Sequence, residues 1–262
     1  MRQKREGAPV YFVLAQVRFN AIWNLESYIG AIQESLRREY PDFQNQQTMT
    51  LAVVPGGPQG ATAQQALSQT RYLFGNMDKT AGFSLDTASL AFQTTDYQGF
   101  PVFLEALRKG LAVVHDKVGL TFSERVGLRY LNAVYPGAGG GLSDYLIPEI
   151  RGLSETLAAS LTHAFSETRS QSEAGHVVVA RTLIHDGAVG LPPDLANTQL
   201  KVAERFTALQ GRHAVLDIDA AAEQRLAFTV EDVASRLDRL HDTEKEVFRA
   251  LLTKHARQVW GL

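Results

Sequence analysis

Hydrophobic positions in the first half of the chain follow strand and helix periods in turn. Residues 10–19, Val-Tyr-Phe-Val-Leu-Ala-Gln-Val-Arg-Phe, are rich in β-branched and aromatic side chains, which favours a strand. Apolar residues then recur at helical spacing over residues 25–40, after Asn24, a suitable capping residue. A second amphipathic pattern predicts a helix over residues 100–118 that ends at Gly119.

The other patterns of this half predict strands and turns. Residues 48–54 predict one short strand. Residues 59–70 show no strong hydrophobic period, so this segment is expected to be a loop or a short helix. Residues 71–74 and 81–95 predict a β-meander, and residues 121–134 predict a long strand. The aromatic residues of the meander are expected in the core: Tyr72, Phe74, Phe83 and Phe92.

The second half of the sequence predicts strands followed by one long helix. Residues 161–169 and 176–185 predict a hairpin, and residues 186–212 predict a loop with one helical turn. Residues 214–220 predict a further strand, and a capping-box variant at Thr229 opens a helix expected over residues 229–259. Its apolar stripe, expected to pack on a second sheet or on a second copy, is Val230, Val233, Leu237, Leu240, Phe248, Leu251, Leu252, His255 and Val259.

This order predicts an α+β protein. The N-terminal half has the ferredoxin-like split βαβ pattern, in which the first and last strands lie side by side, antiparallel, and both helices cover one face of the sheet. The predicted domains are residues 1–135 and residues 144–262, a second α+β half closed by the long helix. The Gly-rich run 136–143 is the expected linker, because consecutive glycines resist ordering and no lysine of a phosphate-binding loop is near.

Composition excludes several function classes. The 262 residues are 45% hydrophobic and 21% charged, as in a folded chain, and 26 basic against 28 acidic side chains exclude a uniformly basic surface but not a local basic patch. The absence of cysteine excludes disulfide scaffolds, thiol nucleophiles and iron–sulfur clusters. No apolar run is long enough for a membrane span, so a cytoplasmic location without a membrane partner is expected.

Three arginines are the main candidate site. On a strand, Arg125 and Arg129 project from one face while Val126, Leu128 and Tyr130 project from the other. If the first and last strands of this half are neighbours, Arg18 joins them on the face that the helices leave open. Guanidinium groups bind carboxylates and phosphates, which indicates an anion or acidic-partner site. The alternative is that acids of the second half neutralise the arginines; the candidates are Asp217, Asp219 and Glu223.

Asp217 and Asp219 are the weak candidates for a metal site. Both carboxylates point the same way from one strand, and paired carboxylates can hold Mg²⁺ or Mn²⁺. A third ligand would have to come from Glu167, Glu173 or His185, and nothing in the sequence places these residues nearby. The seven histidines show no metal-ligand spacing within one element. No cofactor is therefore expected.

Several short stretches resemble a sporadically distributed family of bacterial proteins of about 260 residues that has no established function. The similar stretches are Pro-Val-Tyr-Phe-Val-Leu-Ala-Gln-Val-Arg-Phe at 9–19, Leu-Ala-Phe-Gln-Thr-Thr-Asp-Tyr at 90–97, Arg-Val-Gly-Leu-Arg-Tyr-Leu-Asn at 125–132 and the closing helix. Family members often carry acids at the positions of Phe12 and Gln16, where this sequence departs from the pattern. The resemblance implies no catalytic residues, and the patchy distribution implies an accessory or defence-related role.

Three functions follow as hypotheses. The first is a non-catalytic cytoplasmic interaction protein, such as a subunit of a bacterial defence or toxin–antitoxin-like assembly, that binds an anionic partner through Arg18, Arg125 and Arg129 or self-associates through its C-terminal helix. The second is an RNA-binding or RNA-processing protein with ferredoxin-like modules, similar to CRISPR-associated repeat-binding proteins. The weakest is a metal-dependent hydrolase. No P-loop, H-E-x-x-H or G-x-S-x-G motif is present, so the sequence leans against an enzyme.

Overall fold

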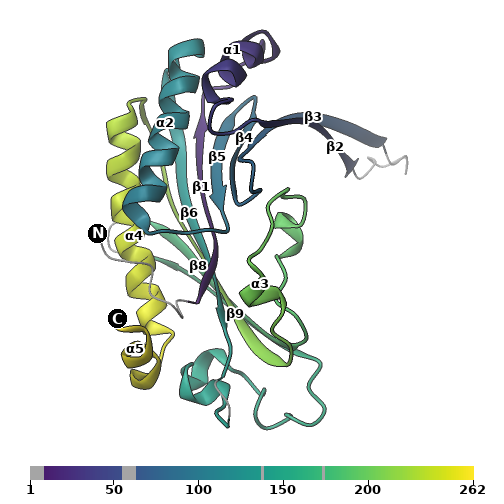
Figure 1. Cartoon of the computed structure of the whole chain (residues 1–262), viewed down its shortest axis with the longest axis vertical. Coiled ribbons are helices and arrows are strands. Elements are labelled where there is room, and N and C mark those ends of the chain that lie inside the picture. Colours follow the sequence, from purple (N-terminus) through teal and green to yellow (C-terminus); the bar gives the residue numbers. More distant parts are fainter. Residues whose placement is uncertain (1–8, 55–62, 137–138, 173–174) are drawn as a thin grey trace.

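One antiparallel sheet carries the fold. The computed structural model describes residues 9–54, 63–136, 139–172 and 175–262, and for residues 48–54 and 63–69 it gives the backbone alone. The sheet has nine strands in the order β2-β3-β4-β5-β1-β6-β9-β8-β7. Helices α2 and α4 lie along one side of the molecule, and α1 lies at its upper end beside α2 (Figure 1). The predicted α+β class, with an antiparallel sheet and a C-terminal helix, is confirmed.

The first part of the chain supplies six of these strands and two helices. In order they are β1 (Val10–Phe19), α1 (Glu26–Leu36), β2 (Asp42–Val54), β3 (Ala63–Gly75), β4 (Ala81–Asp86), β5 (Ser89–Thr94), α2 (Phe100–Val118) and β6 (Phe122–Val134). The second part supplies β7 (His163–Gln171), β8 (Val177–Asp186), α3 (Glu204–Thr207), β9 (Arg212–Ala227), α4 (Val230–Ala250) and α5 (Lys254–Trp260). Short 3₁₀ turns occur at Leu142–Asp144, Pro148–Ile150 and Pro193–Leu195.

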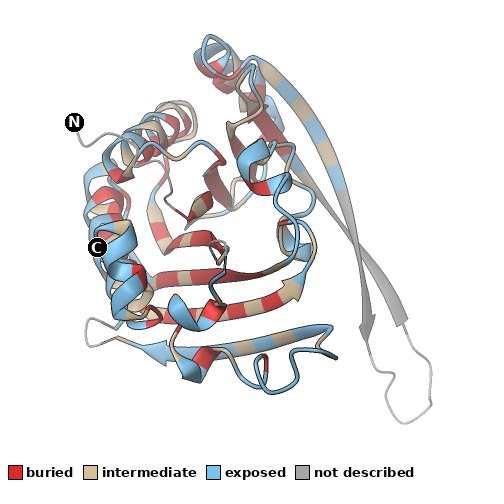
Figure 2. Ribbon diagram, turned by 60° about the horizontal axis from the view of Figure 1, so that its bottom comes forward, coloured by how far each residue is buried: buried red, intermediate tan, exposed pale blue. Residues whose placement is uncertain are grey.

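Strand β1 lies in the interior of the sheet and pairs antiparallel with both β5 and β6. The prediction that the first and last strands of this half are antiparallel neighbours is confirmed. Alternate residues of β1, beginning with Val13 and Ala15, are buried in the same core as Ile32 of α1 and Leu107 of α2. Both helices therefore cover one face of the sheet, and Figure 2 shows the buried residues concentrated between the layers. The four meander aromatics belong to this core, as predicted.

The C-terminal helix is two helices rather than the predicted single one. Helix α4 ends at Ala250, and α5 starts at Lys254 after Thr253, whose hydroxyl accepts a hydrogen bond from the backbone N–H of Ala256. This second N-cap turns the chain, so the predicted stripe does not continue, and His255 and Val259 are exposed. The stripe of α4 packs on β6 and β9 of the same sheet, not on a second sheet.

Residues 59–70 also differ from the expected loop or short helix. Residues 55–62 lie outside the described part of the chain, and residues 63–75 form β3, paired with β2 along its whole length. Polar, alanine-rich strands lack a clear period, and here the pairing with β2 overrides weak local preference. Helix α1 is shorter than predicted, and it begins without a side-chain cap from Asn24.

The second half extends the same sheet through the pairing of β9 with β6. The predicted hairpin is confirmed as β7 and β8. Residues 187–211, called the cover segment below, form the expected loop with short helical turns. Together with Tyr11, Phe12 and Leu131, Val189 and Phe206 of the cover segment make a second, smaller core on the opposite face of the sheet. A division into domains 1–135 and 144–262, with a linker at 136–143, stays a prediction, and residues 137–138 of the linker are not described.

Candidate functional site: an arginine pair on the open sheet face

The sheet face opposite helices α1, α2 and α4, called the open face below, carries a row of charged side chains. The register places Arg18 of β1 directly opposite Arg125 of β6, and Arg125 directly opposite Glu223 of β9. Two residues farther along β1 and β6, Gln16 faces Gly127. Because directly paired residues project from the same face, the sheet geometry brings Arg18 and Arg125 together.

Arg125 keeps much of its hydrogen-bonding capacity. Its guanidinium donates to Gln16 Oε1 over 3.4 Å, and its nitrogens lie 3.7 Å from Asp219 Oδ1 and 3.6 Å from Glu223 Oε1. These two acid contacts are longer than a charge-assisted hydrogen bond. The guanidinium extends over Gly127, where an added Cβ would lie 2.6 Å from Arg125 Nη1. Because Gly127 has no side chain, the Arg125 guanidinium can occupy the space above it.

Arg18 differs from Arg125 in exposure and partners. Its side chain is exposed, and among the described residues it has neither a hydrogen bond nor an ion pair. Its other strand neighbour is Ser89, whose hydroxyl donates to Asp86 Oδ2 over 2.8 Å. Arg18 and Arg125 thus form a pair of neighbouring cations, one open to solvent and one only loosely held by acids.

Arg129 does not join this pair. Its Nε and Nη2 each lie 2.7 Å from an oxygen of Asp217, and its Nη1 lies 2.5 Å from Asp194 Oδ2 in the cover segment. Arg129 is also largely buried, and these two carboxylates raise its pKa further above the ordinary arginine value even though burial opposes them. The alternative prediction, in which acids of the second half neutralise the arginines, therefore describes Arg129.

Asp217 and Asp219 share the open face, as their spacing predicted. Asp217 is buried between Arg129 and Arg181, and Arg181 also lies 2.6 Å from Glu167 of β7. A carboxylate held by two guanidinium groups is already neutralised and has few lone pairs left for a cation. Across the described ranges, no group of three or more His, Asp or Glu side chains could hold a metal ion. Glu173, another suggested ligand, lies outside those ranges.

Three histidines form a row that sequence spacing did not reveal. His163, His185 and His213 lie opposite one another on β7, β8 and β9, and the rings of His185 and His213 are 4.3 Å apart. His213 Nδ1 lies 3.0 Å from the carbonyl of Gly211, and burial lowers its pKa. The His213 ring also stacks on Tyr135, so these contacts are those of side-chain packing at the end of the sheet.

Two exposed side chains, Trp23 and Arg225, lie at the end of the sheet that holds Arg18. Trp23 is 96% exposed in the loop after β1, and this loop is tied to the sheet by a hydrogen bond from the Ile22 N–H to Thr87 O. Arg225, near the end of β9, lies over the ring of Phe122 at 4.4 Å. Tryptophan and arginine are the residue types that most often dominate binding energy at protein interfaces. Sequence reasoning missed Trp23 because no pattern marks an exposed tryptophan.

A buried polar chain lies on the other, helix-covered face. The hydroxyl of Tyr130 is 3.1 Å from that of Tyr97 and 3.0 Å from His241 Nδ1, and His241 stacks on Phe100. Burial lowers the pKa of His241 to about 4 and raises the pKa of Tyr97 to about 12. The spacing of the histidines in the sequence did not mark His241, so its link to Tyr130 was missed.

Glu244, one turn after His241 on α4, is buried. Burial raises its pKa well above the usual glutamate value, and the charges of Asp219 and Asp217 act in the same direction. The backbone of Ala220 acts against this rise, but neither carboxyl oxygen has a hydrogen-bond partner among the described residues, so burial prevails. A carboxyl this deeply buried is not accessible as a binding site for a charged ligand.

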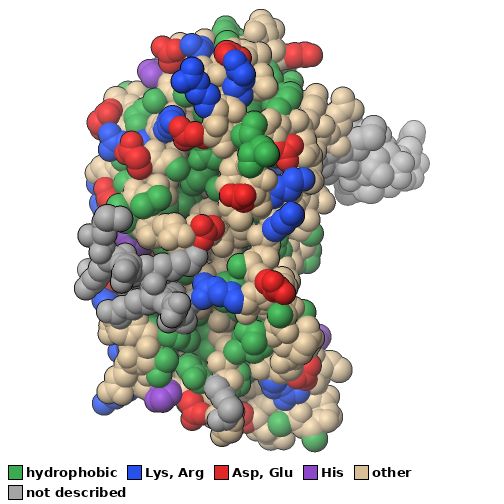
Figure 3. Space-filling view, viewed as in Figure 1, with side chains coloured by type: hydrophobic (Ala, Val, Ile, Leu, Met, Phe, Trp, Pro, Cys, Tyr) green, Lys and Arg blue, Asp and Glu red, His purple; other side chains and the backbone are tan. Residues whose placement is uncertain are grey.

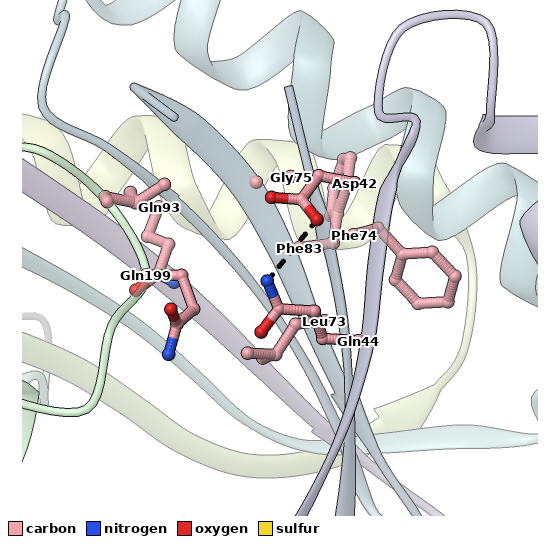
Figure 4. A pocket seen from close by; sticks show the side chains of 10 residues that line it. Asp42, Gln44, Leu73, Phe74, Gly75, Phe83, Gln93 and Gln199 are labelled. Carbon is pink, nitrogen blue, oxygen red and sulfur yellow. Dashed lines mark hydrogen bonds between the residues drawn. The ribbon is translucent and has the colours of Figure 1, made fainter. Parts of the chain in front are cut away.

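A shallow pocket lies at the β2–β5 end of the open face. Asp42 and Gln44 of β2, Gln93 of β5 and Gln199 of the cover segment contribute to its lining (Figure 4). Gln44 Nε2 donates to Asp42 Oδ1 over 3.3 Å. The lining is mostly amide and apolar, and its residues include no histidine or basic group that could act in acid–base chemistry.

Comparison with known protein-family models finds no match, and comparison with curated proteins finds none either. The resemblance to a sporadic bacterial family stays a prediction. No helix of the described residues has both the length and the apolar character needed to cross a membrane.

Proposed function

We propose that this protein is a non-catalytic binding protein that holds a short acidic segment of a partner polypeptide at Arg18 and Arg125. The observation that carries the proposal is the direct pairing of these two arginines across β1 and β6. Like charges directly opposite each other on neighbouring strands destabilise a sheet, and a bound carboxylate between them would remove that cost. Arg18 is exposed and Arg125 has unused donors, so both can reach such a ligand.

The surrounding charges favour a short acidic segment over a nucleic acid. Asp219 and Glu223 lie beside Arg125, and Asp194 and Glu167 lie farther along the same face. A long polyanion would meet these carboxylates, whereas one or two acidic side chains fit the arginine pair alone. Figure 3 shows basic and acidic side chains intermixed over the face in view. Trp23 near the same end of the sheet suits a polypeptide partner.

We also propose that the N-terminal half has the ferredoxin-like arrangement. Its support is the neighbour order β4-β5-β1-β6 with α1 and α2 on one face, to which β2 and β3 add a hairpin at the edge. In this description the two central strands, β5 and β1, lie between β4 and β6, and β6 supplies Arg125. Membership of a defence or toxin–antitoxin-like assembly stays a prediction.

The experiment is a fluorescence-anisotropy titration with three labelled probes, a hexaglutamate peptide, a hexalysine peptide and a single-stranded RNA. We expect the purified chain to bind hexaglutamate, with affinity that falls as salt rises, and to leave hexalysine unbound. Arg18→Glu should weaken hexaglutamate binding by about tenfold or more, which corresponds to about 1.4 kcal/mol.

The matched control is Arg249→Glu, the same change at an exposed arginine on α4. It should leave the affinity for hexaglutamate within about twofold of the unchanged chain, because distant surface charges are screened. Equal effects of the two substitutions would contradict the proposal. Tighter binding of RNA than of hexaglutamate, lost in Arg18→Glu, would instead support the nucleic-acid hypothesis.

A further inference from the structure

The β2–β3 hairpin projects from the body of the molecule as a two-stranded arm. The two strands pair with each other over their whole length, from Asp42 opposite Gly75 to Val54 opposite Ala63. Strand β3, however, pairs with β4 only over Tyr72–Gly75. Among the described residues, the rest of β3 has a strand neighbour on one side only, and the outer edge of β2 has none. Figure 1 shows the labelled strands β2 and β3 extending away from the rest of the sheet.

An isolated two-stranded ribbon is marginally stable in water, and an open strand edge is a template for pairing with another chain. Proteins usually protect such an edge with charged side chains. The opposite edge of this sheet, β7, follows that rule, because Glu167 and Arg169 are both exposed there. The edge at β2 does not, because residues 43–70 contain no Asp, Glu, Lys, Arg or His.

We infer that the outer edge of β2 pairs antiparallel with β2 of a second copy of this chain. An antiparallel contact between identical strands is closed by a two-fold axis, so the edge is used up and no filament grows. Residues 43–54 of β2 carry no charge, so they can pair with the same strand of a second copy without placing like charges opposite each other. With the axis near Thr48, the middle residue of β2, all of its residues from Asp42 to Val54 find a partner. The sheets of two copies then become continuous.

This contact is independent of the arginine pair on the open face. It also differs from self-association through the C-terminal helix, since α4 packs against β6 and β9 of its own chain. The two proposals can therefore fail separately, because one is read out by mass and the other by peptide affinity.

The test is size-exclusion chromatography with light scattering on the full chain over a range of concentrations. We expect a mass twice the 28.8 kDa of one chain. Thr48→Lys and Thr48→Glu should each raise the dimer dissociation constant by about tenfold or more, because like charges then meet near the axis. An equimolar mixture of the two variants should recover the dimer, which also shows that each variant remains folded.

The matched control is Thr168→Lys in β7, the edge strand at the other end of the sheet. It should leave the dimer unchanged. A wild-type chain that stays monomeric at all concentrations would overturn the proposal, and so would Thr48 variants that dimerise as the wild type does. A mixture that stays monomeric while both variants keep wild-type circular dichroism would also overturn it.

Discussion

Arg18 and Arg125 face each other directly across the β1–β6 pair, with Arg125 also opposite Glu223 on its other side. Like charges directly opposite each other weaken a strand pair, and of the two arginines only Arg125 has acids nearby, Asp219 and Glu223 at 3.6–3.7 Å. The repulsion destabilises the free protein. Binding sites retain such destabilising arrangements because a bound ligand relieves them.

The first prediction concerns the free energy of unfolding of the free protein. Arg18→Ala should raise it by about 0.2–1 kcal/mol, because the substitution removes the repulsion from Arg125. Urea denaturation at low salt measures the change. Arg249→Ala, at an exposed arginine on α4, should change stability by less, and a loss of stability in Arg18→Ala relative to this control would contradict the account.

The second prediction concerns the buried ionic network around Asp217. Asp217→Asn should lower the free energy of unfolding by about 3–5 kcal/mol, because Arg129 and Arg181 then lose a buried partner. Glu223→Gln, at an exposed acid on the same strand, should cost less than about 1 kcal/mol. Chemical denaturation of both variants checks the difference, and similar losses would show that the network contributes little.

The third prediction separates the position of Arg125 from the stability of the sheet. In Gly127→Ala the new methyl group would lie 2.6 Å from Arg125 Nη1, the far end of a flexible side chain. The guanidinium should move aside, so unfolding should change by about 1 kcal/mol or less. Binding of hexaglutamate should nevertheless weaken. Retained affinity would mean that the position of Arg125 over Gly127 is unimportant for binding.

The fourth prediction concerns pH and Glu244. In the folded state burial raises the pKa of this carboxyl, whereas in the unfolded state it ionises at its usual value. At pH values between these two pKa values the unfolded state binds fewer protons than the folded state. The free energy of unfolding therefore falls as pH rises from the unfolded pKa to the folded pKa. Glu244→Gln cannot ionise and should therefore gain melting temperature relative to wild type at pH 8 but not at pH 4.

His241 acts in the opposite direction and must be separated from Glu244. Burial lowers its pKa to about 4, so the unfolded state binds more protons below the usual histidine value and stability falls as pH decreases from there to about 4. The control for Glu244 is Glu246→Gln, an exposed position on the same helix. An identical pH profile for the two glutamine variants would show that Glu244 is ionised in the folded protein.

Sequence periodicity located the strongly patterned elements well. Helix α2 spans residues Phe100–Val118 and ends at Gly119 in the left-handed conformation, as its apolar stripe and the glycine predict. It also placed Arg18 and Arg125 on one face, because strand alternation fixes the side from which a residue projects.

Long-range partners could not be predicted in the same way. Residues 63–70 have no clear period, and they form a strand because β2 lies beside them. The separation of Arg129 from Arg125 depends on Asp217 and on Asp194 in a distant loop. The burial of Glu244 depends on how α4 crosses the sheet. None of these contacts has a local sequence pattern.

A double-substitution cycle on Arg18 and Arg125 examines whether the two side chains hold the same ligand. Hexaglutamate affinity is measured for wild type, Arg18→Ala, Arg125→Ala and the double variant at one low salt concentration. If both guanidinium groups grip one acidic segment, each single variant loses affinity and the double variant loses clearly less than the two losses combined. If the losses simply add, or if neither single variant binds more weakly than wild type, the arginine pair is not a shared anion site.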